Sequence, residues 1–212
     1  MNEQIRNPDM DNKSATFLER LSRWAVPRRI TLNRAVLFVV LVVLTHPRNR
    51  IFFAAGLALA LAGAVLRIWA RVTPPDRPGG LVMKGPYQLV RHPMYLGTAL
   101  QAAGMWVACF GFRNFVSFAM LGLILGGYML FVYKQAILLE EEEMMSQWAG
   151  EWEHYASRTP VFLPGKEAVK QLRWSSVGPL DFRRLEKFKE WKNFLACLGI
   201  FAFLWFKLVY RL

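Results

Sequence analysis

Residues 51–70 read IFFAAGLALALAGAVLRIWA, an apolar run that is interrupted by one charged side chain, Arg67. A helix of about 20 predominantly apolar residues is long enough to cross the hydrocarbon core of a bilayer. The following Thr73-Pro74-Pro75 ends such a helix, because proline has no N–H to continue the hydrogen-bond ladder. This stretch therefore predicts a transmembrane helix and argues against a water-soluble fold.

Further apolar runs extend the pattern along the chain. Those of similar character are residues 93–112, 115–133 and 194–209. The run 115–133 carries Gly122 and Gly126, a spacing that lets helix backbones approach closely in lipid. Another run begins at Ala35 and stops at His46, so it spans only if residues 30–34 extend it. The sequence predicts an all-α fold, a polytopic membrane helix bundle with about five transmembrane helices.

Composition supports this class. The chain has 212 residues, of which 54% are hydrophobic, and its mean hydropathy is +0.22, too apolar for an ordinary soluble domain. Cys109 and Cys197 both lie within apolar runs, which predicts no disulfide framework. The 3 histidines belong to no Cys/His cluster, so we expect no bound metal.

Charge predicts the orientation in the membrane. Lys and Arg number 27 against 15 Asp and Glu, a net charge of +12. With five spans, the basic residues concentrate in the amino-terminal segment and in the second and fourth loops. Because basic residues accumulate on the cytoplasmic side, we expect these segments to face the cytoplasm, as in a protein of the cell inner membrane. A basic collar of this kind meets anionic membrane lipids, and no stacking platform or reading helix indicates a nucleic-acid partner.

Three parts follow from these patterns. Residues 1–34 form a basic cytoplasmic segment, in which residues 17–26 are either an amphipathic helix on the membrane surface or a solvated tail. Residues 35–164 form the membrane core. Residues 165–212 provide a basic cytoplasmic linker and a carboxy-terminal transmembrane helix.

The second loop ends in KGPYQLVRHPMYLG, residues 84–97. A helix that starts after His92 leaves its first N–H groups free, with their partial positive charge, beside Arg91. An anionic group such as a carboxylate would be held there. Tyr95 can share a helix side with His92, and Gly97 leaves room for a ligand or a neighbouring helix. Each residue alone could equally be an ordinary anchor at the headgroup level, but the combined run favours a binding site.

Four adjacent glutamates, residues 140–143, follow the span 115–133. Adjacent side chains on a helix point in different directions, so one or two of these carboxylates face the bundle. Glutamates near a bilayer are costly unless they meet a cation or hydrogen-bond donors. We expect Glu140 and Glu141, which are nearest the membrane, to lie within reach of Arg91 and His92, whereas the other two are as easily explained as a solvated face.

These motifs carry a resemblance. GPYQLVRHPMYLG, the glutamate pair and the distal WEHYASRTP at residues 152–160 resemble the isoprenylcysteine carboxyl methyltransferase and phospholipid methyltransferase superfamily of integral membrane enzymes. The likeness covers about residues 55–164 and implies S-adenosyl-L-methionine as the methyl donor, bound in a cytoplasmic pocket between the motifs. The cofactor-binding positions that it implies are Gly85, Tyr87, Arg91, His92, Pro93, Tyr95, Gly97, Glu140, Glu141, Tyr155 and Arg158. It assigns no catalytic residue.

The chemistry of the donor agrees with these positions. Arg91 and His92 suit its carboxylate, and a glutamate suits its ammonium or ribose hydroxyls. Methyl transfer depends on alignment and needs no metal. The acceptor, a lipophilic or small molecule, is left open, as is a general base, for which Glu142, Glu143 and Tyr87 are candidates. Family members often carry an arginine four residues before the glutamate pair, and Ala136 at that position weakens the case for a carboxylate acceptor, which stays among the open alternatives.

Two other readings stay open. A membrane reductase of the sterol or steroid reductase type resembles this superfamily in its carboxy-terminal part and binds a nicotinamide nucleotide. A non-catalytic membrane interaction protein could keep the fold without the reaction. Binding of S-adenosylmethionine, of a dinucleotide, or of neither separates the three readings.

Overall fold

The computed structural model describes residues 46–75, 77–110, 115–165, 180–187 and 189–210, all of which belong to one compact unit that begins at Val42. The predicted surface helix at 17–26 and the predicted span from Ala35 lie outside the described residues. Within them, every regular element is helical, so the prediction of an all-α fold is confirmed for this part of the chain.

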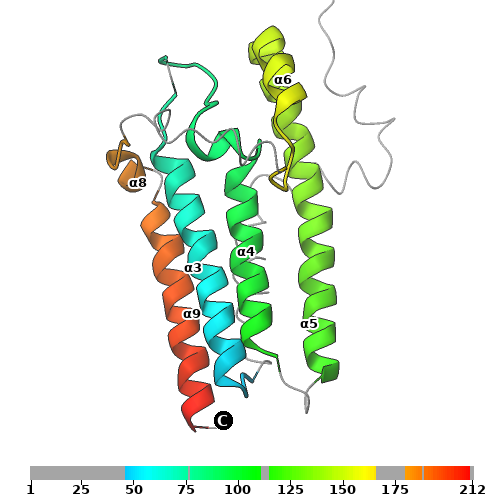
Figure 1. Cartoon of the computed structure of the whole chain (residues 1–212), viewed down its shortest axis with the longest axis vertical. Helices are drawn as coiled ribbons and strands as arrows, with labels where there is room; N and C mark the ends of the chain where they lie inside the picture. Colours follow the sequence, from blue (N-terminus) through cyan, green and yellow to red (C-terminus); the bar gives the residue numbers. More distant parts are fainter. Residues whose placement is uncertain (1–45, 76, 111–114, 166–179, 188, 211–212) are drawn as a thin grey trace, which may run out of the picture. The chain divides into compact units, whose positions relative to one another are not determined.

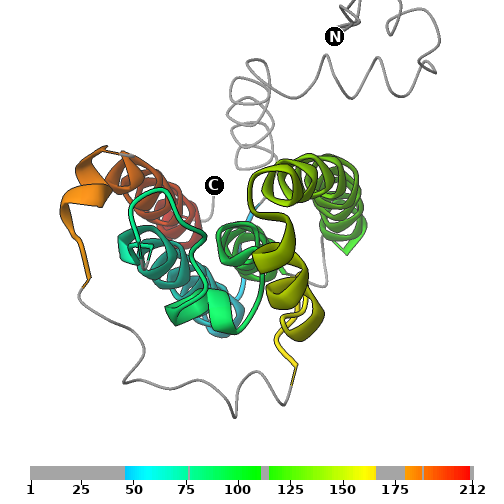
Figure 2. The same ribbon diagram turned by 90° about the horizontal axis from the view of Figure 1, so that it is seen from above.

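The regular elements follow one another along the chain as helices (Figure 1). They are α3 (Arg50–Val72), the 3₁₀-helix η1 (Gly85–Gln88), α4 (Pro93–Ala108), α5 (Phe115–Tyr128), the π-helical turn η3 (Met129–Tyr133), α6 (Lys134–Arg158), α8 (Arg183–Lys187) and α9 (Glu190–Tyr210). Helix α3 packs between α4 and α9, and α5 lies on the far side of α4 (Figures 1 and 2).

Three described helices are long and apolar enough to cross a membrane, judged by length and composition: α3, the stretch Phe118–Arg158, and α9. They indicate an integral membrane protein. Helix α4 has 16 residues and ends at Ala108, before the predicted end at residue 112. It is therefore apolar but shorter than the other candidate spans, and its predicted length was wrong.

Helices α3 and α4 meet through paired glycines. Gly56 faces Gly104, and Gly63 faces Gly97, so that a Cβ atom at any of the four would collide with the opposite backbone. Both pairs keep a spacing of seven residues along antiparallel helices, so two turns of helix separate successive close approaches. Small residues of this kind let helices pack closely where lipid supplies no hydrophobic drive for association.

The glycines of α5 behave differently from the prediction. Gly122 lies against the indole ring of Trp106 on α4, but a Cβ added at Gly126 would meet no described residue within 4 Å. Among the described helices, therefore, none approaches Gly126 closely. The contact between α4 and α5 is made instead by aromatic rings, since Trp106 stacks on Phe118 with ring centroids 4.7 Å apart.

Helices α5, η3 and α6 form one continuous helix that bends at its distal end. Trp148 has φ −136° and ψ 38°, values outside the helical region. Beyond this kink the last turns of α6 lean over η1 and the start of α4 (Figure 2). The hydroxyl of Tyr155 donates a hydrogen bond of 2.8 Å to the carbonyl of Tyr87 and fixes the contact. The kink therefore brings the distal aromatic motif onto the loop that precedes α4.

Candidate functional site

The loop before α4 is held in place by a glycine with a left-handed backbone. Gly85 has φ +61°, and a Cβ at this position would lie 3.1 Å from the hydroxyl oxygen of Thr73 and 3.3 Å from the indole nitrogen of Trp69. Glycine adopts positive φ without the steric cost that other residues meet. Gly85 therefore contributes backbone geometry, packing η1 against the end of α3.

His92 begins α4 and faces the glutamate pair. It is the N-cap residue of α4 and is 4% exposed. Its Nε2 lies 3.1 Å from Oε1 of Glu141, and its Nδ1 lies 3.6 Å from Oε2 of Glu140. The predicted proximity of the two motifs is thus confirmed: the residue that opens α4 touches both carboxylates that follow the long span.

Arg91 joins the same carboxylate to the end of α6. Its Nη1 donates to Oε1 of Glu141 at 2.7 Å, and its Nε donates to the carbonyl of Thr159 at 2.9 Å. Its backbone N–H donates to the carbonyl of Pro160 at 2.8 Å. Carbonyls at a helix end lack intrahelical partners, and here one arginine satisfies two that follow α6. Arg91 therefore links the start of α4, the glutamate pair and the distal motif.

Aromatic rings border this polar cluster on two sides. Towards the membrane, the ring of Tyr95 lies 5.8 Å from that of His92 and 5.0 Å from that of Tyr133, which belongs to the π-helical turn. On the other side, the guanidinium of Arg91 lies 6.0 Å from the ring centroid of Trp152. Such rings favour cations and flat ring systems beside them.

Burial raises the pKa of Tyr87, with Arg71 opposing and Glu140 reinforcing the shift. Burial likewise raises the pKa of Tyr155. Phenols with raised pKa values stay protonated near neutral pH and act as hydrogen-bond donors. Tyr87 is therefore a weak candidate for a general base. Glu142 and Glu143, the other candidates, are exposed on the outer face of α6.

The structure gathers most of the predicted residues but not all of them. Those in or beside the cluster are Tyr87, Arg91, His92, Tyr95, Glu140, Glu141 and Tyr155. Pro93 is buried as the first residue of α4. Gly97 faces α3, where a Cβ would lie 2.7 Å from the carbonyl of Gly63, so its role is helix packing. Arg158 is exposed, and within the described ranges it makes no hydrogen bond to the cluster.

Sequence reasoning missed a second polar cluster near the first. Glu190, the buried first residue of α9, pairs with Arg67 and Arg71 of α3. The sequence does contain a sign of this cluster. Arg67 is a charged residue inside the apolar run 51–70, and Glu190, of opposite charge, stands just before the run 194–209. Tyr133 was also missed, since a π-helical turn shifts the side chains that follow it and apolar periodicity does not reveal such a turn.

The first cluster offers opposite charges side by side. Oε1 of Glu141 accepts hydrogen bonds from both Arg91 and His92, whereas Oε2 accepts none within the described part of the chain. Arginine has five N–H donors, so Arg91 keeps donors beyond those that bind Glu141 and Thr159. The guanidinium of Arg91 contacts the carboxylate of Glu141, and the carboxylate of Glu140 lies 3.6 Å from His92. This set of charges complements a ligand that carries both a carboxylate and an ammonium group. Among the described residues, no group of three or more His, Cys, Asp or Glu is placed to hold a metal ion.

Comparison with known proteins gives one distant likeness. No protein-family model and no solved structure matches the chain. The chain is 28% identical over 153 residues to the nickel-cobalt-cadmium resistance protein NccN of Alcaligenes xylosoxydans xylosoxydans, a match that covers 68% of each protein. The name of that relative describes a resistance to metals.

Proposed function

We propose that this chain is an integral membrane methyltransferase that uses S-adenosyl-L-methionine and resembles the isoprenylcysteine carboxyl and phospholipid methyltransferases. The proposal includes about five spans, one of them α4, and a donor site at the cytoplasmic face. The observation that carries it is the contact of Arg91 and His92 with Glu141, which joins two motifs about fifty residues apart in the sequence.

The donor set of the cluster fits this cofactor. Arg91 and the positive start of α4 would hold its carboxylate, because guanidinium groups and free helix N–H groups both bind anions. Glu140 and Oε2 of Glu141, which accepts no hydrogen bond from a described residue, would hold its ammonium or its ribose hydroxyls. The neighbouring rings of Tyr95 and Trp152 provide surfaces that tolerate a positive charge. Glu141 thus orients Arg91 and His92 and can bind the ligand itself.

When bound, the cofactor supplies a methyl group that its sulfonium already activates. The contribution of the chain is then to hold the donor at the membrane boundary and to align an acceptor with it, a type of catalysis that rests on positioning. The site lies where apolar helices emerge from the bilayer, so a lipophilic acceptor reaches it laterally and a small one from the cytoplasm. A general base is required more by an amine or thiol acceptor than by a carboxylate.

The experiment that tests this function uses membranes containing the chain and methyl-labelled S-adenosylmethionine. We expect label in the lipid, protein or volatile extract, above that of membranes without the chain, and the labelled extract identifies the class of acceptor. Membranes carrying His92→Ala should show background label. Label at background with the wild-type chain, together with binding of a nicotinamide nucleotide, would favour the reductase. If the wild-type chain neither transferred label nor bound a nicotinamide nucleotide, an interaction protein would be favoured.

The likeness to NccN favours a second, physiological proposal: the chain contributes to tolerance of nickel, cobalt or cadmium. Growth of cells with and without the gene, over graded concentrations of each salt, tests this proposal. We expect lower tolerance without the gene. Equal growth at every concentration contradicts the contribution without bearing on the methyl-transfer assay.

A further inference from the structure

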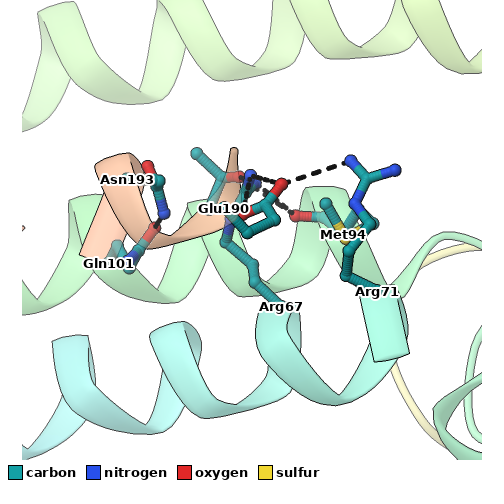
Figure 3. A network of polar contacts seen from close by, with 7 residues as sticks. Arg67, Arg71, Met94, Gln101, Glu190 and Asn193 are labelled. Atoms are coloured by element: carbon teal, nitrogen blue, oxygen red, sulfur yellow. Dashed lines mark hydrogen bonds and ion pairs between the residues drawn. The ribbon is translucent and has the colours of Figure 1, made fainter. Parts of the chain in front are cut away.

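The second polar cluster lies where α3, α4 and α9 meet (Figure 3). Glu190 is 6% exposed, and both of its carboxylate oxygens lie 3.0 Å from Nη2 of Arg67. Nη2 of Arg71 donates to Oε1 of Glu190 at 3.2 Å. A buried carboxylate is costly unless cations and donors surround it, and here two guanidinium groups do so.

Arg67 also contacts the first turn of α4. Its Nη1 donates to the carbonyl of Met94 at 3.2 Å and to the hydroxyl of Thr98. The Thr98 hydroxyl in turn donates to the Met94 carbonyl at 3.0 Å. Gly97 admits the stem of Arg67, since a Cβ there would lie 2.5 Å from its Cγ atom. One arginine thus connects the carboxylate of α9 to the backbone at the start of α4.

Met94 is two residues after His92, in the same first turn. The direction of His92 depends on how this turn is rotated against α3, because its contacts with the glutamate pair are 3.1 and 3.6 Å and allow little displacement. The Arg67 contacts restrain the rotation from the α3 side. Glu190 holds Arg67 through two short contacts of 3.0 Å, so its charge orients the arginine.

We propose that Glu190 is a positioning residue of the donor site: it fixes Arg67, and Arg67 sets the first turn of α4 so that His92 faces Glu140 and Glu141. The significance for methyl transfer rests on the function proposed above. Helix α9 lies outside the region of the family resemblance, yet by this inference it is part of the machinery that binds the donor.

A competing explanation is that Glu190 only anchors α9 to the bundle. A readout at His92 separates the two. The chain has 3 histidines, so histidine-selective labelling of the purified protein in detergent gives few ring resonances. We expect Glu190→Gln to move the ring resonances of His92 and to leave those of His154, which is exposed on the distal part of α6. The matched control, Glu186→Gln, alters an exposed glutamate of α8 and should move neither.

A second pair of variants keeps the test independent of charge and of folding defects. Thr98→Val removes an acceptor of Arg67 with little change of volume or charge, and should move the His92 resonances as Glu190→Gln does. Asn193→Leu removes another contact between α9 and α4, in which Asn193 donates to Gln101 at 3.3 Å. This substitution loosens α9 at a point distant from the first turn of α4. We therefore expect the ring resonances of His92 to stay where they are in wild type.

The affinity for S-adenosylmethionine supplies the second readout. We expect Glu190→Gln and Thr98→Val to weaken binding by about tenfold, as loss of a hydrogen bond to a charged group does, with Asn193→Leu near wild type. His92 resonances unchanged in Thr98→Val would overturn the proposal even if Glu190→Gln failed to fold. If wild type bound no donor but His92 still moved, the proposed function would fail and the positioning contact would stand.

Discussion

Tyr155 connects two segments that the sequence separates widely. Its hydroxyl reaches the carbonyl of Tyr87, on the loop before α4, at 2.8 Å. The ring is buried, and burial raises the pKa of the phenol. The neutral hydroxyl therefore belongs to the folded state, where it donates a hydrogen bond that holds the distal motif over the cluster.

Tyr155→Phe removes this donor. We expect the free energy of unfolding to fall by about 1 kcal/mol near pH 7, the usual net contribution of one hydrogen bond, with a matching loss of thermal stability in detergent. Because the pKa is raised in the folded state, wild type loses this tyrosine's contribution as the pH rises above about 10. The difference between wild type and Tyr155→Phe should then narrow.

Tyr210→Phe serves as the control for this prediction, since Tyr210 is 64% exposed near the end of α9. The unfolding temperature of Tyr210→Phe should match that of wild type both near pH 7 and above about pH 10. If the unfolding temperatures of Tyr155→Phe and wild type differed by the same amount from pH 7 to about pH 11, the role assigned to the buried phenol would be contradicted.

Single residues also mark what the sequence could and could not predict. The pairing of His92 with Glu141 was predictable, because Pro93 sets where α4 starts and the glutamates leave the long span at a similar height. The bonds from Arg91 to the carbonyls of residues 159 and 160 were not. They depend on the kink at Trp148, which involves no proline and leaves no mark in the apolar pattern.

At the level of elements, the closest helix contact is that of α3 with α4. Gly104 faces Gly56 so tightly that a Cβ would lie 2.6 Å from the backbone nitrogen of Ala60. Gly104→Leu should force the two helices apart and destabilise the chain by at least about 2 kcal/mol, as overpacking does in a close-packed interior. Thermal unfolding in detergent measures the loss.

Gly126→Leu is the matched control within α5. No residue of the described part of the chain lies within 4 Å of a Cβ at that position, so the variant should unfold at the wild-type temperature. If it destabilised the chain as much as Gly104→Leu, the paired glycines would not be the contact that holds α3 against α4.

Element boundaries show where sequence reasoning reached its limit. Apolar runs predicted α3, α5 and α9 as helices, because a helix that crosses lipid requires a long stretch of apolar residues. Helix α9 begins at Glu190, four residues before the predicted start at residue 194, because the sequence pattern excludes charged residues from a span. Glu190 is admitted because two arginines of another helix neutralise it, a pairing between distant residues that periodicity does not contain.

For the whole molecule, the distribution of basic residues predicts the orientation. In the described unit, the end of α3 and the start of α9 lie together, since Nη2 of Arg71 lies 3.2 Å from Oε1 of Glu190. The same end carries the glutamate pair. If this end is cytoplasmic, cysteines placed at Gly79 and Lys187 should react with a membrane-impermeant maleimide only in inverted vesicles.

A cysteine at Arg48, before the opposite end of α3, should react only from the external side. Replacing Cys109 and Cys197 with serine removes the background. If Gly79→Cys and Arg48→Cys were labelled from the same side, the claim that α3 crosses the membrane would be contradicted. Labelling with the opposite sidedness would place the donor site on the external face.

The central claim is that the cluster of Arg91, His92 and Glu141 binds S-adenosylmethionine. Calorimetric titration of the purified chain in detergent tests it most directly. We predict saturable binding to wild type, a loss of at least about tenfold in affinity for Glu141→Gln, and wild-type affinity for the exposed neighbour Glu143→Gln. Equal affinity of folded Glu141→Gln and wild type, or no binding to wild type, would contradict the claim.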